Sequence, residues 1–160
     1  MANIALVHDT IDTITITLAS LGNNAGRESV EFDFSAEIWE NAEAQLVIET
    51  GTVSGTPEVD LYFWSSLDTG TTPYPDGFTG ADAAWTPPAT VASHRLFTLP
   101  ALASSTVYET PSLYLADAAY LLGGKLPTIG GFGVYNRTGA AFSATSGNNF
   151  LKIRGVYRTV

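Results

Sequence analysis

Few residues in this sequence carry side chains suited to metal binding or covalent catalysis. The chain has two histidines, His8 and His94, and no cysteine. A zinc site needs several His or Cys ligands, and cysteine nucleophiles are excluded outright. The G-x-S-x-G pattern that presents a nucleophilic serine is also absent. The sequence therefore predicts no metal, no cofactor and no enzymatic activity.

Carboxylates are more numerous, and paired carboxylates hydrolyse glycosides when they face each other across a cleft. Glu58 and Asp60 alternate with apolar residues, so they share one strand face, a pattern typical of the solvated side of a sheet. Asp68, Asp76 and Asp82 follow in a long loop, and their oxygens are of the kind that calcium binds. The ordered D-x-D-x-D-G loop is absent, so no calcium site is defined.

Aromatic residues give the main indication of binding. Residues 65–90 hold four prolines and three glycines without a clear strand period, which predicts a long loop. We expect Tyr74, Phe78 and Trp85 in this loop to bind a partner, because aromatic residues are enriched at interfaces. Packing in the core is the alternative for these rings. If they bind a partner, Trp85→Ala leaves the isolated fold intact.

The N-terminal residues are the second predicted contact element. Residues 1–10 are expected to form a mobile arm that becomes ordered on a neighbouring protein. His8 and Asp9 lie in this arm and complete the set of predicted partner-binding residues.

Alternation of apolar and polar residues, which is typical of half-buried strands, runs through the chain. Nine short strands are predicted from it: 14–18, 30–34, 45–50, 59–64, 94–98, 106–108, 112–115, 131–135 and 150–157. Glycine and asparagine clusters that favour turns separate them. This spacing predicts an all-β fold, an antiparallel β-sandwich resembling a jelly roll.

Some segments give further detail. Residues 35–44 and 116–122 have the character of short helices. In strand 59–64, the side chains of Val59, Leu61 and Phe63 share one face, while Tyr62 and Trp64 share the other. Both faces of this strand are therefore expected to be covered.

The size and charge of the chain limit its partners. Its 160 residues predict a single domain over residues 1–160. The net charge of −9 argues against a nucleic-acid partner, since lysine and arginine supply affinity for phosphate. No apolar run reaches the roughly 18 residues of a membrane span, and no basic residue precedes Arg27 to begin a signal peptide. We expect no membrane partner, and synthesis in the cytoplasm without export.

Charge is unevenly distributed along the chain. Residues 1–94 hold 14 of the 16 acidic residues, and residues 95–160 hold 6 of the 7 lysines and arginines. At the end of the chain, alternation places Lys152, Arg154 and Arg158 on one side of a strand. This basic row is expected to meet acidic residues of the first half, either within one subunit or across two.

Several short runs of turn and strand-edge residues carry a family resemblance. They are Leu18-Ala19-Ser20-Leu21, Gly26-Arg27-Glu28-Ser29, Thr50-Gly51-Thr52-Val53-Ser54-Gly55-Thr56-Pro57, Tyr74-Pro75, Thr79-Gly80-Ala81-Asp82-Ala83-Ala84, Gly123-Gly124-Lys125-Leu126-Pro127, Asn136-Arg137-Thr138-Gly139-Ala140-Ala141 and Gly155-Val156-Tyr157. From residue 18 onward, the chain resembles small structural proteins of tailed bacteriophages and prophages.

The resemblance implies a virion component, a capsid decoration or cement protein on the capsid exterior. It implies the major capsid protein and further copies of the same chain, as a homodimer or homotrimer, as partners. A tail-associated position and a carbohydrate-binding module, which the aromatic cluster would serve, are the alternatives. A decoration protein needs a rigid scaffold and surfaces that bind at many lattice sites at once, which raises the effective affinity of weak contacts.

Overall fold

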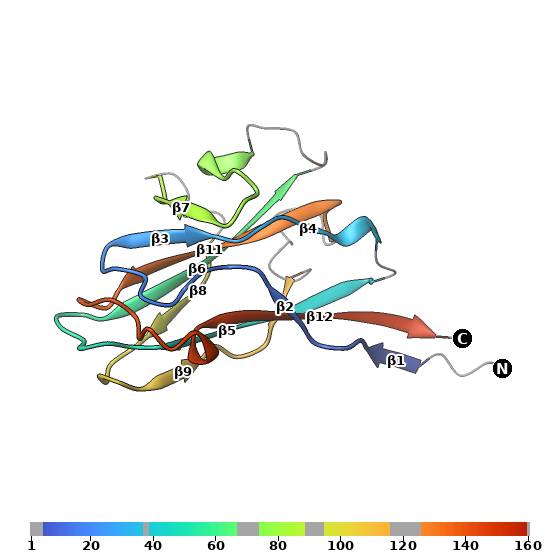
Figure 1. Ribbon diagram of the computed structural model, residues 1–160. Helices are drawn as coiled ribbons and strands as arrows, with labels where there is room; N and C mark the ends of the chain where they lie inside the picture. Colours follow the sequence, from blue (N-terminus) through green and yellow to red (C-terminus); the bar gives the residue numbers. More distant parts are fainter. Residues whose placement is uncertain (1–4, 37–38, 67–73, 89–94, 116–125, 160) are drawn as a thin grey trace.

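The computed structural model describes residues 5–36, 39–66, 74–88, 95–115 and 126–159. Their strands form two antiparallel sheets that pack face to face (Figure 1). The predicted all-β, antiparallel sandwich is thereby confirmed.

Each sheet draws its strands from both halves of the chain. Sheet A consists of β1 (Ala5–His8), β2 (Asp12–Ile14), β5 (Asn41–Glu49), β9 (Val107–Glu109), β10 (Leu113–Tyr114) and β12 (Phe150–Thr159). Sheet B consists of β3 (Ala25–Glu28), β4 (Phe32–Asp33), β6 (Glu58–Ser66), β7 (Ala83–Trp85), β8 (Arg95–Pro100) and β11 (Ile129–Arg137).

The strand order is that of a jelly roll. Strands β1 and β2 follow each other along one edge of β12, as β3 and β4 do along β11 and β9 and β10 along β5. If each such pair is taken as one interrupted strand, the strands in chain order lie as 1-8-3-6 in sheet A and 2-7-4-5 in sheet B. Strand β7 is an addition beside β3. Two Greek keys wound in this way define the jelly roll.

The main core lies between the sheets and is built by every second residue of the long central strands. Sheet A contributes Leu46, Ile48, Leu151 and Ile153, and sheet B contributes Val59, Leu61, Phe63, Phe132 and Val134. All of these side chains are buried. The opposite residues of β6, Tyr62 and Trp64, are buried in a separate cluster, so the prediction that both faces of this strand are covered is confirmed.

This second cluster lies on the outer face of sheet B, under residues 74–85, which we call the aromatic cover. Tyr74, Phe78 and Trp85 of the cover pack on Tyr62 and Trp64. Phe78 and Trp85 are stacked, with ring centroids 4.4 Å apart.

Two glycines of β11 make room for these rings. A Cβ atom on Gly131 would lie 2.7 Å from the ring of Trp64, and one on Gly133 would lie 2.8 Å from the ring of Trp85. Because such distances are shorter than van der Waals contact, a side chain at either position would displace the rings. Glycine is therefore required by the close approach of the cover to the sheet.

The prediction of a long loop over residues 65–90 is wrong in detail. Residues 65–90 were expected to form a loop without regular structure. In the structure β6 continues to Ser66, a 3-10 turn occupies Pro75–Gly77, and β7 pairs with β3. Residues 67–73 and 89–90 lie outside the described part of the chain. Tyr62 and Trp64 point away from the main core, and removing their rings from water is favourable. This explains why the segment packs on the sheet.

The predicted helix over residues 35–44 is wrong. A 3-10 turn covers Phe34–Ala36, and β5 begins at Asn41. Ala42 and Ala44 point into the core while Glu43 faces outward, so the true period is two. The second predicted helix, 116–122, lies outside the described residues. Among the residues that are described, no helix is long and apolar enough to cross a membrane.

Strand predictions near the N-terminus were also shifted. The strand expected at 14–18 is β2, which ends at Ile14, and the strand expected at 30–34 is reduced to β4. Strand β3 was missed because its sequence, Ala-Gly-Arg-Glu, has no apolar alternation. Its pairing with β11 and β7 is a tertiary effect.

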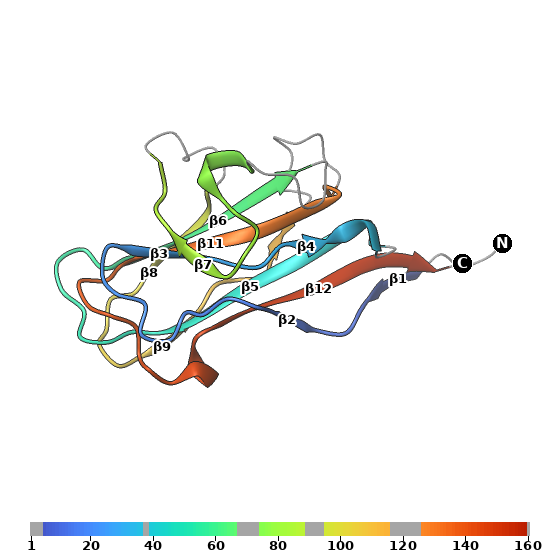
Figure 2. The ribbon, with the colours of Figure 1, turned by 45° about the horizontal axis from the view of Figure 1, so that its top comes forward.

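The two ends of the chain form a two-stranded ribbon. Strand β1 pairs with the end of β12 from Ala5↔Thr159 to His8↔Val156. Strand β5 begins opposite Val156, so the ribbon extends past it, as Figures 1 and 2 show. Residues 5–8 of the expected N-terminal arm are thus part of a sheet, and residues 1–4 lie outside the described residues. The mobility of the arm stays a prediction.

Candidate functional site

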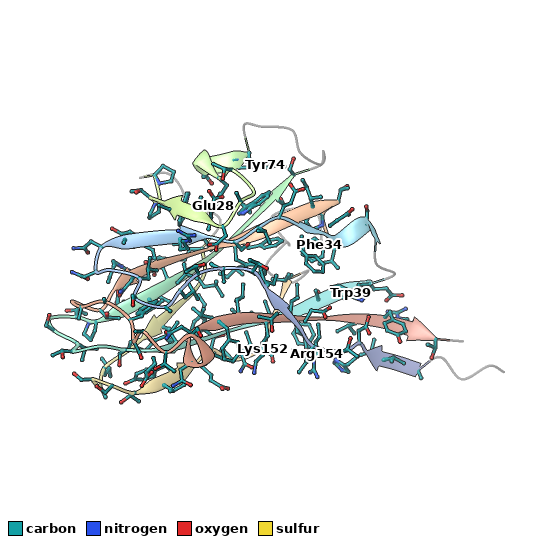
Figure 3. The ribbon with its side chains drawn as sticks, viewed as in Figure 1. Glu28, Phe34, Trp39, Tyr74, Lys152 and Arg154 are labelled. Carbon is teal, nitrogen blue, oxygen red and sulfur yellow. The ribbon has the colours of Figure 1, made fainter. Side chains whose placement is uncertain are left out.

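The two outer faces of the sandwich differ. The aromatic cover lies on sheet B, whereas sheet A has no comparable cover in the described part of the chain (Figure 1), although Asn148 reaches Glu49 at one end of it. Figure 3 shows Glu28 and Tyr74 on the covered side and Lys152 and Arg154 on the opposite side. We call the outward-pointing side chains of sheet A the open face.

Strand register places the residues of the open face in cross-strand rows. Arg154 of β12 lies opposite Glu43 of β5, and Glu43 lies opposite Tyr114 of β10. Lys152 lies opposite Gln45 in the neighbouring row. Side chains of directly opposed residues point to the same face, so the rows are contiguous on the surface.

Glu43 is the centre of this face. Its side chain is only 5% exposed, and its carboxylate accepts a hydrogen bond from Nε of Arg154. Nδ1 of His8 lies 3.8 Å from the same oxygen. Burial acts to raise the pKa of Glu43, but hydrogen bonds from Tyr114 and Arg154 outweigh it and hold the pKa below its ordinary value. Glu43 is thus an anionic anchor that holds the side chains of Arg154 and Tyr114, with His8 beside it.

Beside Glu43 lies a shallow depression of about 160 Å³. Its lining includes one apolar side chain, Ile11, and the polar or charged side chains of Glu43, Gln45, Ser112, Lys152 and Arg154. Among the described residues no ion pair forms with Lys152, whose ammonium group lies 5.7 Å from the ring of Phe150. The depression therefore offers a cation and several hydrogen-bonding groups in a space about as large as one side chain.

Exposed apolar side chains surround this polar centre. Leu6 of β1 is 61% exposed, Ile11 60%, Val107 of β9 46% and Tyr114 40%. Leu6 lies opposite Arg158 and Val107 opposite Glu49, which places both on the open face. Ile11 and Tyr114 adjoin Arg154 and Glu43. Large exposed apolar side chains gathered on one face, together with tyrosine and arginine, are features of surfaces that bind protein.

The three aromatic residues predicted to bind a partner are buried. Tyr74, Phe78 and Trp85 are 4%, 2% and 5% exposed and belong to the cover. Core packing, the alternative for these rings, is what the single chain shows. A role for them in partner binding stays a prediction, which would require the cover to open.

His8 and Asp9 have different surroundings. His8 is exposed and lies in the Glu43 cluster of the open face. Asp9 accepts a hydrogen bond of 2.9 Å from the indole of Trp39, and this bond lowers the pKa of Asp9. Asp9 therefore links the ribbon to the core, and of the two residues His8 is the one placed for contact.

The open face contains residues that sequence reasoning missed. Glu43, Tyr114 and Ile11 were not identified because nothing in the local sequence joins β5, β10 and the turn before β2. The alternation around Glu43, between Ala42 and Ala44, was an available signal for an outward carboxylate.

Of the carboxylates considered for catalysis or calcium, Asp68 lies outside the described residues, and Glu58, Asp60 and Asp82 pair with arginines. Asp60 was expected on a solvated face, but its side chain is 3% exposed, 2.8 Å from Nη2 of Arg137 and 2.6 Å from the hydroxyl of Thr98. Asp82 binds Arg27. In the part of the chain that is described, no three His, Cys, Asp or Glu side chains form a group that could hold a metal ion.

The basic second half of the chain meets the acidic first half within one subunit. Arg154 pairs with Glu43, and Arg158 pairs with Glu40 at 3.1 Å. Of the two alternatives for the basic row, pairing within one subunit is therefore what the structure shows for these two arginines. The interleaving of both halves in each sheet, seen in the strand order, brings the opposite charges together.

The fold and the open face define a class, a jelly-roll β-sandwich in which one outer face is partly covered by aromatic residues and the other is accessible. No family model and no curated protein matches the chain.

The anchoring of Glu43 predicts a pH dependence of stability. Because the folded pKa is below the ordinary value near 4.5, the stabilisation is complete above that value and is lost as the pH falls through the folded pKa. We expect the difference in free energy of unfolding between the native chain and Glu43→Gln to be largest at neutral pH and to shrink below about pH 4.5. Urea titrations from pH 3 to pH 7 measure it; a difference independent of pH would contradict the role of the charge.

Proposed function

We propose that this chain is a structural protein of a bacteriophage virion, a decoration protein that binds the outer surface of the capsid through the open face. Its partners are the major capsid protein and other copies of the chain. In this proposal the chain binds and neither makes nor breaks a covalent bond.

The observation that carries the proposal is the contrast between the two faces. The chain covers the Tyr62 and Trp64 part of the outer face of sheet B with its own aromatic residues. It leaves Ile11 and Tyr114 exposed on the side of sheet A, around the hydrogen-bonded Glu43–Arg154 pair. A preorganised face loses little side-chain entropy on binding. Tyrosine and arginine are also among the residue types that most often dominate binding energy.

The jelly-roll scaffold and the resemblance to phage structural proteins agree with this role. Jelly rolls occur widely in viral capsid proteins. A capsid presents many identical sites, and a protein that binds only the assembled shell shifts the equilibrium toward assembly. Modest affinity at each open face is sufficient for such stabilisation when copies are linked.

The test uses particles of the phage that encodes the chain, prepared without it. Purified native chain should bind these particles at a ratio that matches the symmetry of the shell. Ile11→Glu should weaken binding at least tenfold, because it places a charge at an apolar contact.

The matched control is Leu102→Glu, the same change at a residue that is 71% exposed in the connection between β8 and β9. We expect this variant to bind like the native chain. Absence of binding to intact particles, equal losses in both variants, or turnover of any substrate would overturn the proposal.

Carbohydrate binding is the second candidate, since lectins also use jelly rolls. The rings that suggested it are buried, but Tyr114 lies beside a depression lined by Gln45 and Lys152, where a sugar could stack and form hydrogen bonds. A glycan array with and without calcium separates the two functions, and a tail-associated position would appear as binding to tails rather than to capsids.

A further inference from the structure

The outer edge of β1 is available for pairing with another strand. Strand β1 pairs with β12 on one side, and no described strand pairs with its other side. The ribbon that carries it extends past β5 (Figure 2), so its edge stands clear of the sandwich. Among the described strands, none stands in the way of a further strand at this edge.

The backbone groups at this edge can be assigned from the ladder. The N–H of Asp9 donates to the carbonyl of Gly155 at 2.9 Å. In an antiparallel pair, alternate residues bond to the neighbour, so Val7 also bonds toward β12. The N–H and carbonyl groups of Leu6 and His8 therefore point away from β12, toward the open edge.

Strand β1 lacks the features that protect the other sheet edges. Strand β8 carries Arg95 and Pro100, and β2, β4, β7, β9 and β10 are three residues long or shorter. Strand β1 has four residues, Ala-Leu-Val-His, without proline, lysine or acidic side chains. Natural proteins rarely leave an apolar edge unprotected unless it is paired.

We infer that β1 pairs antiparallel with β1 of a second copy of this chain, which joins two A sheets into one. The absence of formal charge favours this occupant. A two-fold contact places the same short strand on both sides, so a strand with a net charge would face like charge. With a net charge of −9, two chains are expected to associate where charge is absent. This inference does not depend on capsid binding.

The two-fold axis passes through Val7. Val7 then faces Val7 of the second copy, and Leu6 of each chain faces His8 of the other. Leu6 and His8 exchange both N–H and carbonyl groups in each pair, so every outward backbone group of these residues is satisfied. The exposed Leu6 side chain is covered at the same time.

Leu6→Pro and Leu6→Ala form a matched pair that tests the backbone contact. Proline removes the outward N–H donor without taking a bond from the β1–β12 ladder, whereas alanine keeps the donor. Light scattering on the native chain, as it elutes from a size-exclusion column, should show a dimer. We expect Leu6→Pro to raise the dissociation constant at least tenfold more than Leu6→Ala, with an unchanged β-type circular dichroism spectrum in both.

Val7→Cys provides a second, covalent test. The chain has no cysteine, so a disulfide-linked dimer must form through the introduced thiol. Opposed residues of a non-hydrogen-bonded pair have Cα atoms about 4.5 Å apart, which a disulfide spans. Mild oxidation should cross-link Val7→Cys almost completely and the control Leu102→Cys only slightly. A monomeric or trimeric native chain, a dimer equally sensitive to both Leu6 variants, or equal cross-linking of the two cysteines would overturn the inference.

Discussion

Trp85→Ala should lower the free energy of unfolding by about 3–5 kcal/mol, as is usual when a large buried aromatic residue is removed. Trp85 is 5% exposed, and its ring stacks on Phe78 and contacts Tyr62 edge-on at 5.1 Å. Its indole N–H donates to the carbonyl of Asp76 at 3.1 Å. The substitution thus leaves a cavity and removes a hydrogen bond that holds the 3-10 turn of the cover.

Equilibrium unfolding in urea measures this loss. The control is Leu102→Ala, a truncation at an exposed residue, for which we expect a change within about 0.5 kcal/mol. A destabilisation of Trp85→Ala no larger than that of the control would show that the cover does not contribute to the fold. Trp85 would then be available to a partner, as the sequence hypothesis proposed.

The second large effect is expected at Glu28, whose side chain is fully buried under the cover. Its carboxylate accepts hydrogen bonds from the N–H and hydroxyl of Thr79, both at 2.7 Å, and from the N–H of Gly80 at 3.3 Å. Hydrogen bonds to a charged group each contribute about 1.5–3 kcal/mol. We therefore expect Glu28→Ala to lower the free energy of unfolding by about 3 kcal/mol or more.

Glu28→Gln refines this test because it keeps the shape of the side chain. The amide group of Gln has only one acceptor oxygen, and its NH2 group faces N–H donors of the cover, with which it cannot form a hydrogen bond. We therefore expect Glu28→Gln to loosen residues 74–85 as well. Hydrogen exchange at Thr79 and Gly80 reports this loosening, and Glu109→Gln, a change at an exposed residue of sheet A, is the control. Equal exchange in Glu28→Gln and the control would contradict the role of Glu28 as the attachment of the cover.

Trp85 and Glu28 illustrate what the local sequence pattern can and cannot predict about the cover. The alternation in β6 predicts that Tyr62 and Trp64 are covered, and the structure confirms it. It does not say which segment covers them. The identity of the cover depends on Glu28, whose outward direction follows from the pairing of β3 with β11 and β7, and on Gly133, which lies opposite Glu28 in β11. Both residues are far from the loop in sequence.

The candidate site shows the same division. His8 and the basic row were identified from the sequence, since composition and alternation are local properties. Their meeting with Glu43 and Tyr114 requires the register of β1, β12, β5 and β10, which is fixed by contacts between distant segments.

The sequence by itself determined the antiparallel sandwich, the inner parts of its four central strands and the opposite charges of its two halves, because strand period and residue type are local properties of the sequence. Only the tertiary structure decided that Tyr74, Phe78 and Trp85 face inward and that sheet A keeps an exposed outer face. The physical reason is that the burial of a ring depends on what packs against it, and the surroundings of these rings include Ile129 and Gly133 of β11 and Glu28 of β3, which are far from the cover in sequence.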